Sequence, residues 1–232
     1  MPSVQRPAAK SARQTHHRPP RQRSQRGRRE KGQRVRTVVR GLWIPFPNAE
    51  FQALLTEIAS LKPDAVFVFF AGAGAAKFVR DYTAAGLRKT IPLFGSGFLT
   101  DGILDGIQDV AQGLETTLHY ADGLNTKRDK EFRAAYTKAY TSEPDVYAVQ
   151  GYDAGLLLAT GLDVVKGDIS KRKEIIAAME QAKIDSPRGA WTMSKAHNPI
   201  QDIYLRKVTA RENRLVSIAH KALADPARGC KM

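Results

Sequence analysis

The chain changes character near Val38, where a long polar segment gives way to short apolar runs. The run 65–70 is apolar at every position, which is typical of a parallel strand covered on both faces, so we expect a central strand there. Trp43–Phe46 predicts a shorter strand, and Asn48 is placed to cap a helix. The apolar residues of that helix recur at helical spacing on one face: Phe51, Leu54, Leu55, Ile58 and Leu61.

A strand-helix-strand unit is predicted around the central strand. Gly72 and Gly74 make the turn into a helix that Gly86 ends, and Ile91–Phe94 predicts the next strand. Such a crossover between parallel strands is almost always right-handed. Because Leu114–Tyr120 predicts a further strand, the fold class indicated is α/β with an open parallel sheet.

Two apolar helices and a hairpin are predicted in the last third. Val146–Val165 forms a long apolar helix, and Ser170 starts a second one. Both helices need a surface to cover. The tail has strands near Ile203–Val208 and Leu215–Ile218, which we expect to form a hairpin turned at Glu212 and the residue after it.

The formal net charge of +14 comes almost entirely from the start of the chain. Residues 1–40 hold 13 of the 37 Lys and Arg but one acid, Glu30, whereas the remainder has 24 bases and 22 acids. Residues 1–37 are rich in Arg, Gln, Pro and Ser, and they cannot bury enough apolar surface to offset their chain entropy. We therefore expect a disordered basic arm, or the product of out-of-frame or mis-started translation.

Nucleic-acid binding through this basic arm is an alternative function. The arm has no aromatic residue on which a base would stack and no folded DNA-binding pattern, so no specific nucleic acid is expected as a partner. The same segment has the positive charge of a signal peptide without its apolar centre, and no stretch approaches the roughly 20 apolar residues of a membrane helix. The sequence as written therefore predicts no signal peptide.

Catalytic and cofactor motifs are weak. The glycine turn at 72–74 follows a strand and opens a helix, but Lys77 occupies the third glycine position of a dinucleotide loop, so a nucleotide-dependent α/β enzyme is only an alternative. The histidines are scattered, Cys230 has no companion, and the run 95–97 lacks the wider frame of a nucleophile elbow. We expect no enzyme activity, no metal and no cofactor.

Aromatic residues gather near the predicted ends of strands and starts of helices, where the crevice of an open parallel sheet forms. Each of them alone is more often a core residue than a ligand contact. Together they predict a cleft with aromatic walls. They are Phe70, Phe98, Tyr120, Tyr147 and Tyr152.

Five segments resemble, in their order and spacing, the leucine/isoleucine/valine-binding type of solute receptor of ABC importers, a type I periplasmic binding protein. The resemblance runs from about Val38 to the end and begins well inside such a protein, and the C-terminal part resembles the branch that takes up aromatic carboxylates. The segments are Val38–Gln52, Lys62–Val66, Leu93–Gly97, Tyr147–Ala154 and Arg188–Gly189.

The resemblance implies a periplasmic receptor, not an enzyme, that holds a small organic solute between two lobes and delivers it to an ABC permease. The solute would be an aromatic carboxylate or a branched-chain amino acid. Residues 38–145 would form the second lobe, 146–184 the helices that pack on the first lobe, and 185–232 the closing strands and tail. The first lobe would be largely missing, which leaves half a cleft.

The resemblance also carries ligand contacts over by position, to Gly72, Ala73, Ser96, Gly97 and Tyr147. Where amino-acid binders place a carboxylate against the ligand's ammonium group, this chain has glycine at 97. Leaving that ammonium buried and unpaired would cost on the order of several kcal/mol, so an uncharged or acidic aromatic solute is expected.

Three further ligand contacts do not come from the resemblance. They are predicted only because these residues are expected at strand ends and helix starts. They are Phe98, Tyr120 and Tyr152.

Overall fold

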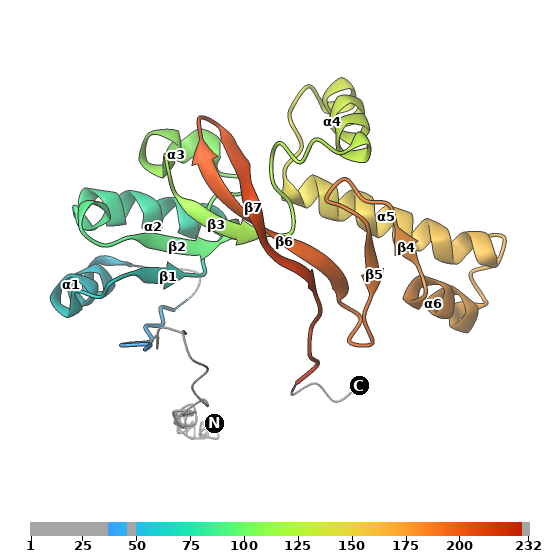
Figure 1. Cartoon of the computed structure of the whole chain (residues 1–232), viewed down its shortest axis with the longest axis horizontal. Helices are drawn as coiled ribbons and strands as arrows, with labels where there is room; N and C mark the ends of the chain where they lie inside the picture. The colour runs from blue at the N-terminus through green and yellow to red at the C-terminus, as the bar shows by residue number, and fades with distance from the viewer. Residues whose placement is uncertain (1–36, 46–49, 229–232) are drawn as a thin grey trace, which may run out of the picture. The chain divides into compact units, whose positions relative to one another are not determined.

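The computed structural model describes residues 37–45 and 50–228. The chain divides between Val39 and Arg40, and the elements below all belong to the unit that begins at Arg40 (Figure 1). Its helices are α1 (Gln52–Leu61), α2 (Gly72–Ala84), α3 (Leu104–Ala111), α4 (Lys127–Tyr140), α5 (Val146–Val164) and α6 (Arg172–Glu180), with 3-10 turns η1 (Leu87–Lys89) and η2 (Gly97–Leu99). Its strands are β1 (Val66–Val68), β2 (Leu93–Ser96), β3 (Glu115–Leu118), β4 (Lys183–Ile184), β5 (Trp191–Met193), β6 (Pro199–Thr209) and β7 (Glu212–Leu223).

The strands form one seven-stranded sheet in the order β1-β2-β3-β6-β5-β4, with β7 along β6. The pairs β1·β2 and β2·β3 are parallel, which confirms the predicted parallel α/β half, and the remaining pairs are antiparallel. Strand β6 is long enough to pair with β5 near its start and with β3 further along. It therefore links the parallel strands to the segment that carries β4 and β5.

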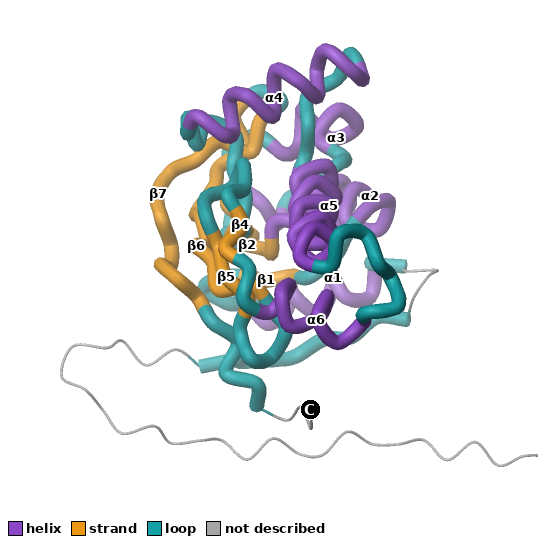
Figure 2. The backbone as a smooth tube through the Cα atoms, turned by 90° about the vertical axis from the view of Figure 1, so that its right-hand side faces the viewer, coloured by secondary structure: helices purple, strands orange, loops and turns teal. Residues whose placement is uncertain are grey.

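Helices α1, α2 and α3 share one buried core with the parallel strands. The strand period puts Val66, Val68 and Phe70 on the covered side of β1. The Phe70 ring lies 5.2 Å from that of Phe51 and 4.9 Å from that of Phe78, which joins the strand to α1 and α2. Figure 2 shows the strands on one side and these helices on the other.

Two smaller cores lie further along the chain. One joins the end of β3 to α4 and the first turns of α5. The other joins the middle of α5 to β4 and β5, where Trp191 and Ile184 meet Leu156 and Leu157. The predicted long helix and the predicted tail hairpin are thus confirmed.

The prediction that residues 65–70 form a central strand covered on both faces is wrong. Strand β1 is the terminal strand of the sheet, and Phe67 and Phe69 on its uncovered side are 70% and 68% exposed. The apolar pattern is that of a central strand, but the described residues supply helices for one face only.

Three local predictions also need correction. Trp43–Pro45 forms no strand, and Trp43 is 87% exposed; Phe46 and Asn48 lie outside the described residues. Helix α6 begins at Arg172 because the Ser170 hydroxyl donates to Asp168 instead of capping the helix. The hairpin turns at residues 210 and 211, two residues before the predicted turn at Glu212 and Asn213, since β7 already begins at Glu212.

The predicted arm, residues 1–37, lies almost wholly outside the described part of the chain, as does Cys230.

Candidate ligand-binding site

The parallel strands end at one edge of the sheet, and this edge is the candidate site. Strand β1 leads to Phe69 and then to Gly72, β2 leads to Ser96 and Phe98, and β3 leads to His119. The carboxyl ends of strands in open α/β sheets are where ligands bind, because the connections there diverge and leave a crevice.

Three aromatic rings line this edge, and we call them the aromatic wall: Phe69, Phe98 and Tyr147. The Phe69 and Phe98 rings meet edge to face at 6.1 Å, and Phe98 and Tyr147 stack at 6.0 Å. Tyr147 comes from the first turn of α5, so the wall joins two strand ends to a helix that is distant in sequence. Phe69 and Tyr147 remain exposed, which leaves apolar aromatic surface for a planar ligand.

Ser96 supplies a polar group at the end of β2. Its Oγ is buried and has no hydrogen-bond partner among the described residues. A buried hydroxyl without a partner costs on the order of 1–3 kcal/mol, and native proteins keep few of them. The Ser96 hydroxyl therefore keeps an unused hydrogen-bond donor at the end of β2, although the atom has no exposed surface in this structure.

The N-terminus of α2 faces the same edge. Ala71, the residue before the helix, provides no side-chain cap for the backbone N–H groups of the first turn. Gly72 has a φ of +56°, and a Cβ built there would meet nothing within 4 Å, so space is open beside it. Together with exposed Ala73, it presents N–H groups that favour an anion.

His119 was not predicted as a site residue, although it directly follows β3. Its Nε2 lies 3.2 Å from Nε2 of Gln150 on α5. Burial, and then the charges of Arg188 and Arg206, lower the pKa of His119 to about 3, so the imidazole is neutral near pH 7. Its position immediately after a parallel strand was the signal available in the sequence.

Gly97 lies at the predicted position but has a packing role. A Cβ there would meet Cβ of Leu118 at 2.6 Å and the guanidinium of Arg206. The Gly97 carbonyl accepts a hydrogen bond from Arg206 Nη2 at 3.2 Å. The glycine thus lets β2 and its turn approach a buried arginine, and we leave it out of the proposed contacts.

Tyr120 and Tyr152 lie in the second core, against which Phe98 of the wall also packs. The Tyr120 hydroxyl donates to Asp129 at 2.9 Å and accepts from Arg133 at 3.0 Å, and the residue is 2% exposed. The Tyr152 ring packs 4.9 Å from that of Phe132. Their predicted role in ligand binding stays a prediction, and the contacts described are those of core residues.

Two carboxylates lie near Tyr147 but are already engaged. Asp101 pairs with Arg206 at 2.7 Å, and Asp145 accepts from the Ala148 N–H at the start of α5. Burial, followed by these two acids, raises the pKa of Tyr147, so its hydroxyl stays protonated near neutral pH. Asp101 is thus paired with an arginine, and Asp145 uses one of its two oxygens to cap α5.

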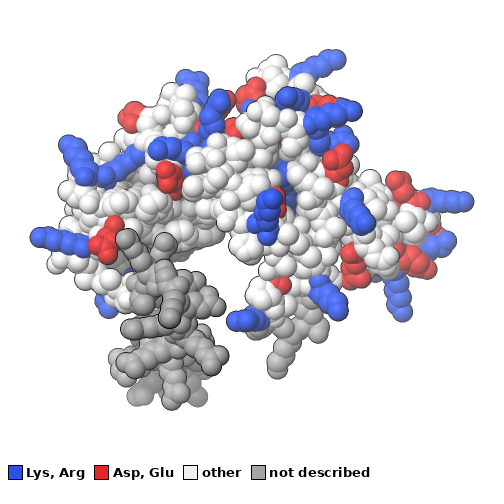
Figure 3. Space-filling model, viewed as in Figure 1, with Lys and Arg blue, Asp and Glu red and all other residues white. Residues whose placement is uncertain are grey.

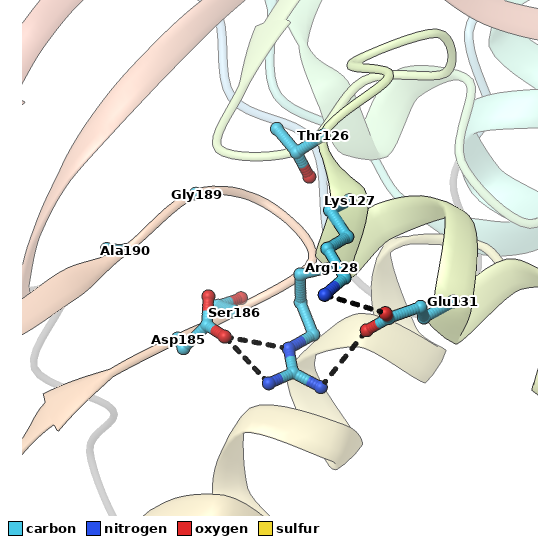
Figure 4. Close-up of a pocket in the computed structure, with 8 residues that line it drawn as sticks. All are labelled: Thr126, Lys127, Arg128, Glu131, Asp185, Ser186, Gly189 and Ala190. Atoms are coloured by element: carbon cyan, nitrogen blue, oxygen red, sulfur yellow. Dashed lines mark hydrogen bonds and ion pairs between the residues drawn. The ribbon is translucent and has the colours of Figure 1, made fainter.

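A separate cavity of about 380 Å³ lies between the start of α4 and the loop after β4 (Figure 4). Arg128 reaches across it to Asp185 at 2.7 Å, and both Arg128 and Lys127 approach Glu131. Because its charged groups are paired with one another, the cavity offers a ligand less than the strand ends do.

Other site types receive no support from the part of the chain that the structure describes. It contains no group of three or more His, Cys, Asp or Glu placed to hold a metal. None of its helices has the length and hydropathy needed to cross a membrane. On the face shown in Figure 3, acidic side chains lie among the basic ones instead of leaving a continuous basic surface.

Comparison with known proteins identifies the class. The sequence profile of the periplasmic binding proteins matches residues 25–213, and the chain belongs to this family. None of the curated proteins matches the chain.

Solved structures agree with this assignment. The solute-binding protein of an ABC transporter from R. palustris, solved with benzoate, is 49% identical over 82% of this chain, with a TM-score of 0.77. A solute-binding protein from Rhodopseudomonas palustris BisB5, solved with 3,4-dihydroxybenzoic acid, is 32% identical over 80% of this chain, with a TM-score of 0.71. This chain spans 52% of the length of each.

A leucine-binding protein from Thermotoga maritima shares the fold alone. It is 20% identical, has a TM-score of 0.63, and the match covers 73% of this chain and 48% of that one.

Proposed function

We propose that this chain forms one wall of the solute site of an ABC importer's extracytoplasmic receptor, and that the solute is an aromatic carboxylate. The observation that carries the proposal is the aromatic wall at the strand ends, next to the unpartnered Ser96 hydroxyl and the uncapped start of α2. An aromatic surface beside hydrogen-bond donors matches a ligand that has a flat ring and an anionic group.

The ring of the solute packs against Phe98 and Tyr147, where offset or edge-to-face contacts add to the burial of apolar area. Its carboxylate accepts from the N–H groups of Gly72 and Ala73, and from the buried Ser96 hydroxyl after that side chain turns toward the solute. Benzoate and 3,4-dihydroxybenzoic acid, the ligands of the two R. palustris proteins, both have this combination of ring and carboxylate.

An α-amino acid fits this site less well. Its ammonium group would need an acid, and the acids near the wall are held by Arg206 and by the first turn of α5. Burying the ammonium group without a partner would weaken the binding free energy by on the order of several kcal/mol. The site therefore selects against leucine-like solutes.

The complete receptor would close a second surface over the solute and pass it to a membrane permease. This chain spans about half the length of its solved relatives, and the described residues form one side of the proposed site. We expect it to bind the solute more weakly than a closed receptor does, because less of the ligand is buried.

Equilibrium dialysis with labelled benzoate tests the proposal on the full chain. We expect saturable binding that 3,4-dihydroxybenzoate displaces and that benzyl alcohol and leucine do not, since one lacks the carboxylate and the other the ring. Equal displacement by leucine, or no binding at millimolar benzoate, would contradict the proposed solute class.

A pair of variants locates the site. Tyr147→Ala removes one ring of the wall. We expect roughly tenfold weaker binding, which corresponds to a loss of about 1.4 kcal/mol of binding free energy. Tyr140→Ala on α4 is the matched control, because Tyr140 is also exposed but packs against Tyr136. Equal affinities of the two variants would show that the solute binds elsewhere.

A further inference from the structure

Two polar side chains meet at the same edge of the sheet as the aromatic wall, and we call His119 and Gln150 the polar pair. His119 directly follows β3, and Gln150 lies on α5. Their Nε2 atoms are 3.2 Å apart, and both residues are partly exposed. The solute contacts proposed above leave this pair unused.

The polar pair borders the aromatic wall. Gln150 lies three residues after Tyr147 in α5, so the two side chains are neighbours on one side of the helix, with Cβ atoms about 5–6 Å apart. The last register partners of β2 and β3 are followed two residues later by Phe98 and His119. The stack of Phe98 on Tyr147 and the polar pair are therefore two successive contacts between the strand ends and α5.

The polar pair leaves one hydrogen-bond donor and one acceptor open. The lowered pKa of His119 keeps its ring neutral, so Nε2 accepts from the Gln150 amide, which leaves Nδ1–H of His119 as a donor and Oε1 of Gln150 as an acceptor. Turning the amide around exchanges the roles and again leaves one donor and one acceptor. Among the described residues, the fully buried side-chain atoms without a partner all belong to other residues, so both open groups keep exposed surface.

A hydroxyl group fits the polar pair, because it both donates and accepts a hydrogen bond. A carboxylate supplies acceptors alone, and an ammonium group supplies donors alone. The ammonium group is disfavoured further, because the charges of Arg188 and Arg206 already oppose a positive charge at His119. A neutral hydroxyl meets neither difficulty.

The spacing of the strands relates the polar pair to the proposed carboxylate contacts. Gly72 follows β1 and His119 follows β3, with β2 between them. Neighbouring strands are about 4.8 Å apart, so the two places are separated by about 10 Å. An aromatic acid with a hydroxyl opposite its carboxylate spans such a gap when each end makes a hydrogen bond, and its ring then crosses the aromatic wall. A hydroxyl next to the carboxylate would stay near α2.

We propose that the polar pair binds a ring hydroxyl of the solute, so that this chain prefers aromatic acids hydroxylated at the end of the ring opposite the carboxylate. The inference rests on the proposed function, which places the ring and the carboxylate. His119 and Gln150 are then specificity-determining residues. A solute without the hydroxyl covers the pair and leaves its donor and acceptor unpaired, and a site built to bind a hydroxyl rejects such analogues.

Equilibrium dialysis of the full chain against a matched set of acids tests this preference. We expect 4-hydroxybenzoate to bind roughly tenfold tighter than benzoate, the effect of one well-placed hydroxyl. The hydroxyl of 2-hydroxybenzoate lies next to the carboxylate, and the ether of 4-methoxybenzoate cannot donate, so we expect neither acid to show this gain. Equal affinities for benzoate and 4-hydroxybenzoate would overturn the inference.

A variant of Gln150 tests whether the polar pair causes the preference. Gln150→Met removes the amide but keeps a side chain of similar length and a good helix former. We expect the ratio of the affinities for 4-hydroxybenzoate and benzoate to fall from roughly tenfold to about one. Gln181→Met is the matched control, since Gln181 is exposed at the end of α6, and we expect it to keep the wild-type ratio. The ratio compares two ligands of one protein, so it does not depend on the fraction of the variant that is folded.

Each remaining outcome separates this inference from the proposed function. An unchanged ratio in Gln150→Met overturns the inference, and if both affinities fall together, the carboxylate and not the hydroxyl lies at the polar pair. Binding of benzoate with no preference for a hydroxyl overturns the inference and leaves the proposed function standing. Binding of neither acid refutes the proposed function and this inference with it.

Discussion

Arg206 is the residue on which the packing behind the candidate site depends. It is 1% exposed, pairs with Asp101 at 2.7 Å, and donates to Thr116 and to the carbonyls of Gly97 and Tyr120. A buried ion pair is stable only when its remaining hydrogen-bonding groups are also satisfied, and here backbone carbonyls complete the set. The guanidinium thereby holds the ends of β2 and β3 together.

Gly97→Ala tests this arrangement. A methyl group at position 97 would meet Leu118 at 2.6 Å, so β2 and its turn must shift away from the arginine. Overpacking of this kind costs about 1–3 kcal/mol, and we expect that loss in the free energy of unfolding measured with urea. Gly74→Ala is the control, because a Cβ at 74 meets nothing within 4 Å and alanine favours a helix. Equal stability of the two variants would refute the packing role of Gly97.

The lowered pKa of His119 predicts how the free energy of unfolding depends on pH. Its pKa is lowered in the folded chain from 6.5 to about 3, so the unfolded chain binds the proton first as the pH falls. Its contribution to stability is fully present above pH 6.5 and is lost progressively toward pH 3.

His119→Gln removes this group while keeping a neutral polar side chain beside Gln150, Arg188 and Arg206. We expect the wild type to lose about 2 kcal/mol more of its unfolding free energy than the variant between pH 7 and pH 5. Urea unfolding at the two pH values measures the difference. The same pH slope in both proteins would mean that folding does not lower the pKa of His119.

At the scale of elements, periodicity predicted the order of helices and strands well. The apolar stripe of α1, the long apolar helix α5 and the strand-helix-strand unit around α2 all formed where they were expected. These predictions succeed because each element's pattern reflects its own burial. The prediction for β1 was wrong because its apolar pattern is typical of a strand that is buried on both faces. Among the described residues, helices cover only one face of β1.

The candidate site was only partly predictable, and one pair of residues shows why. Phe69 and Phe70 are neighbours in the sequence, so they point to opposite faces of β1. Sequence alone favoured Phe70, but Phe70 packs against Phe51 and Phe78, and Phe69 joins the aromatic wall. Which of two adjacent aromatic residues faces the core depends on where the helices pack, and that is a tertiary property.

Tyr120 illustrates the same limit. It follows a parallel strand, as a ligand contact would, but the hydroxyl is satisfied by Asp129 and Arg133 from α4. The sequence contains no sign that α4 would return to cover it. His119, its neighbour, belongs to no sequence motif that would mark it as a site residue.

At the scale of the whole molecule, the chain belongs to the periplasmic binding protein family, and the solute surface that we propose lies at the ends of its parallel strands.

Thermal unfolding of the full chain with and without benzoate tests the proposed solute surface most directly, because a ligand that binds the folded state raises its stability by mass action. We expect a cooperative transition that moves to higher temperature as benzoate is added, and that leucine at the same concentration leaves in place. A transition that benzoate does not move, or that leucine moves as far, would contradict it.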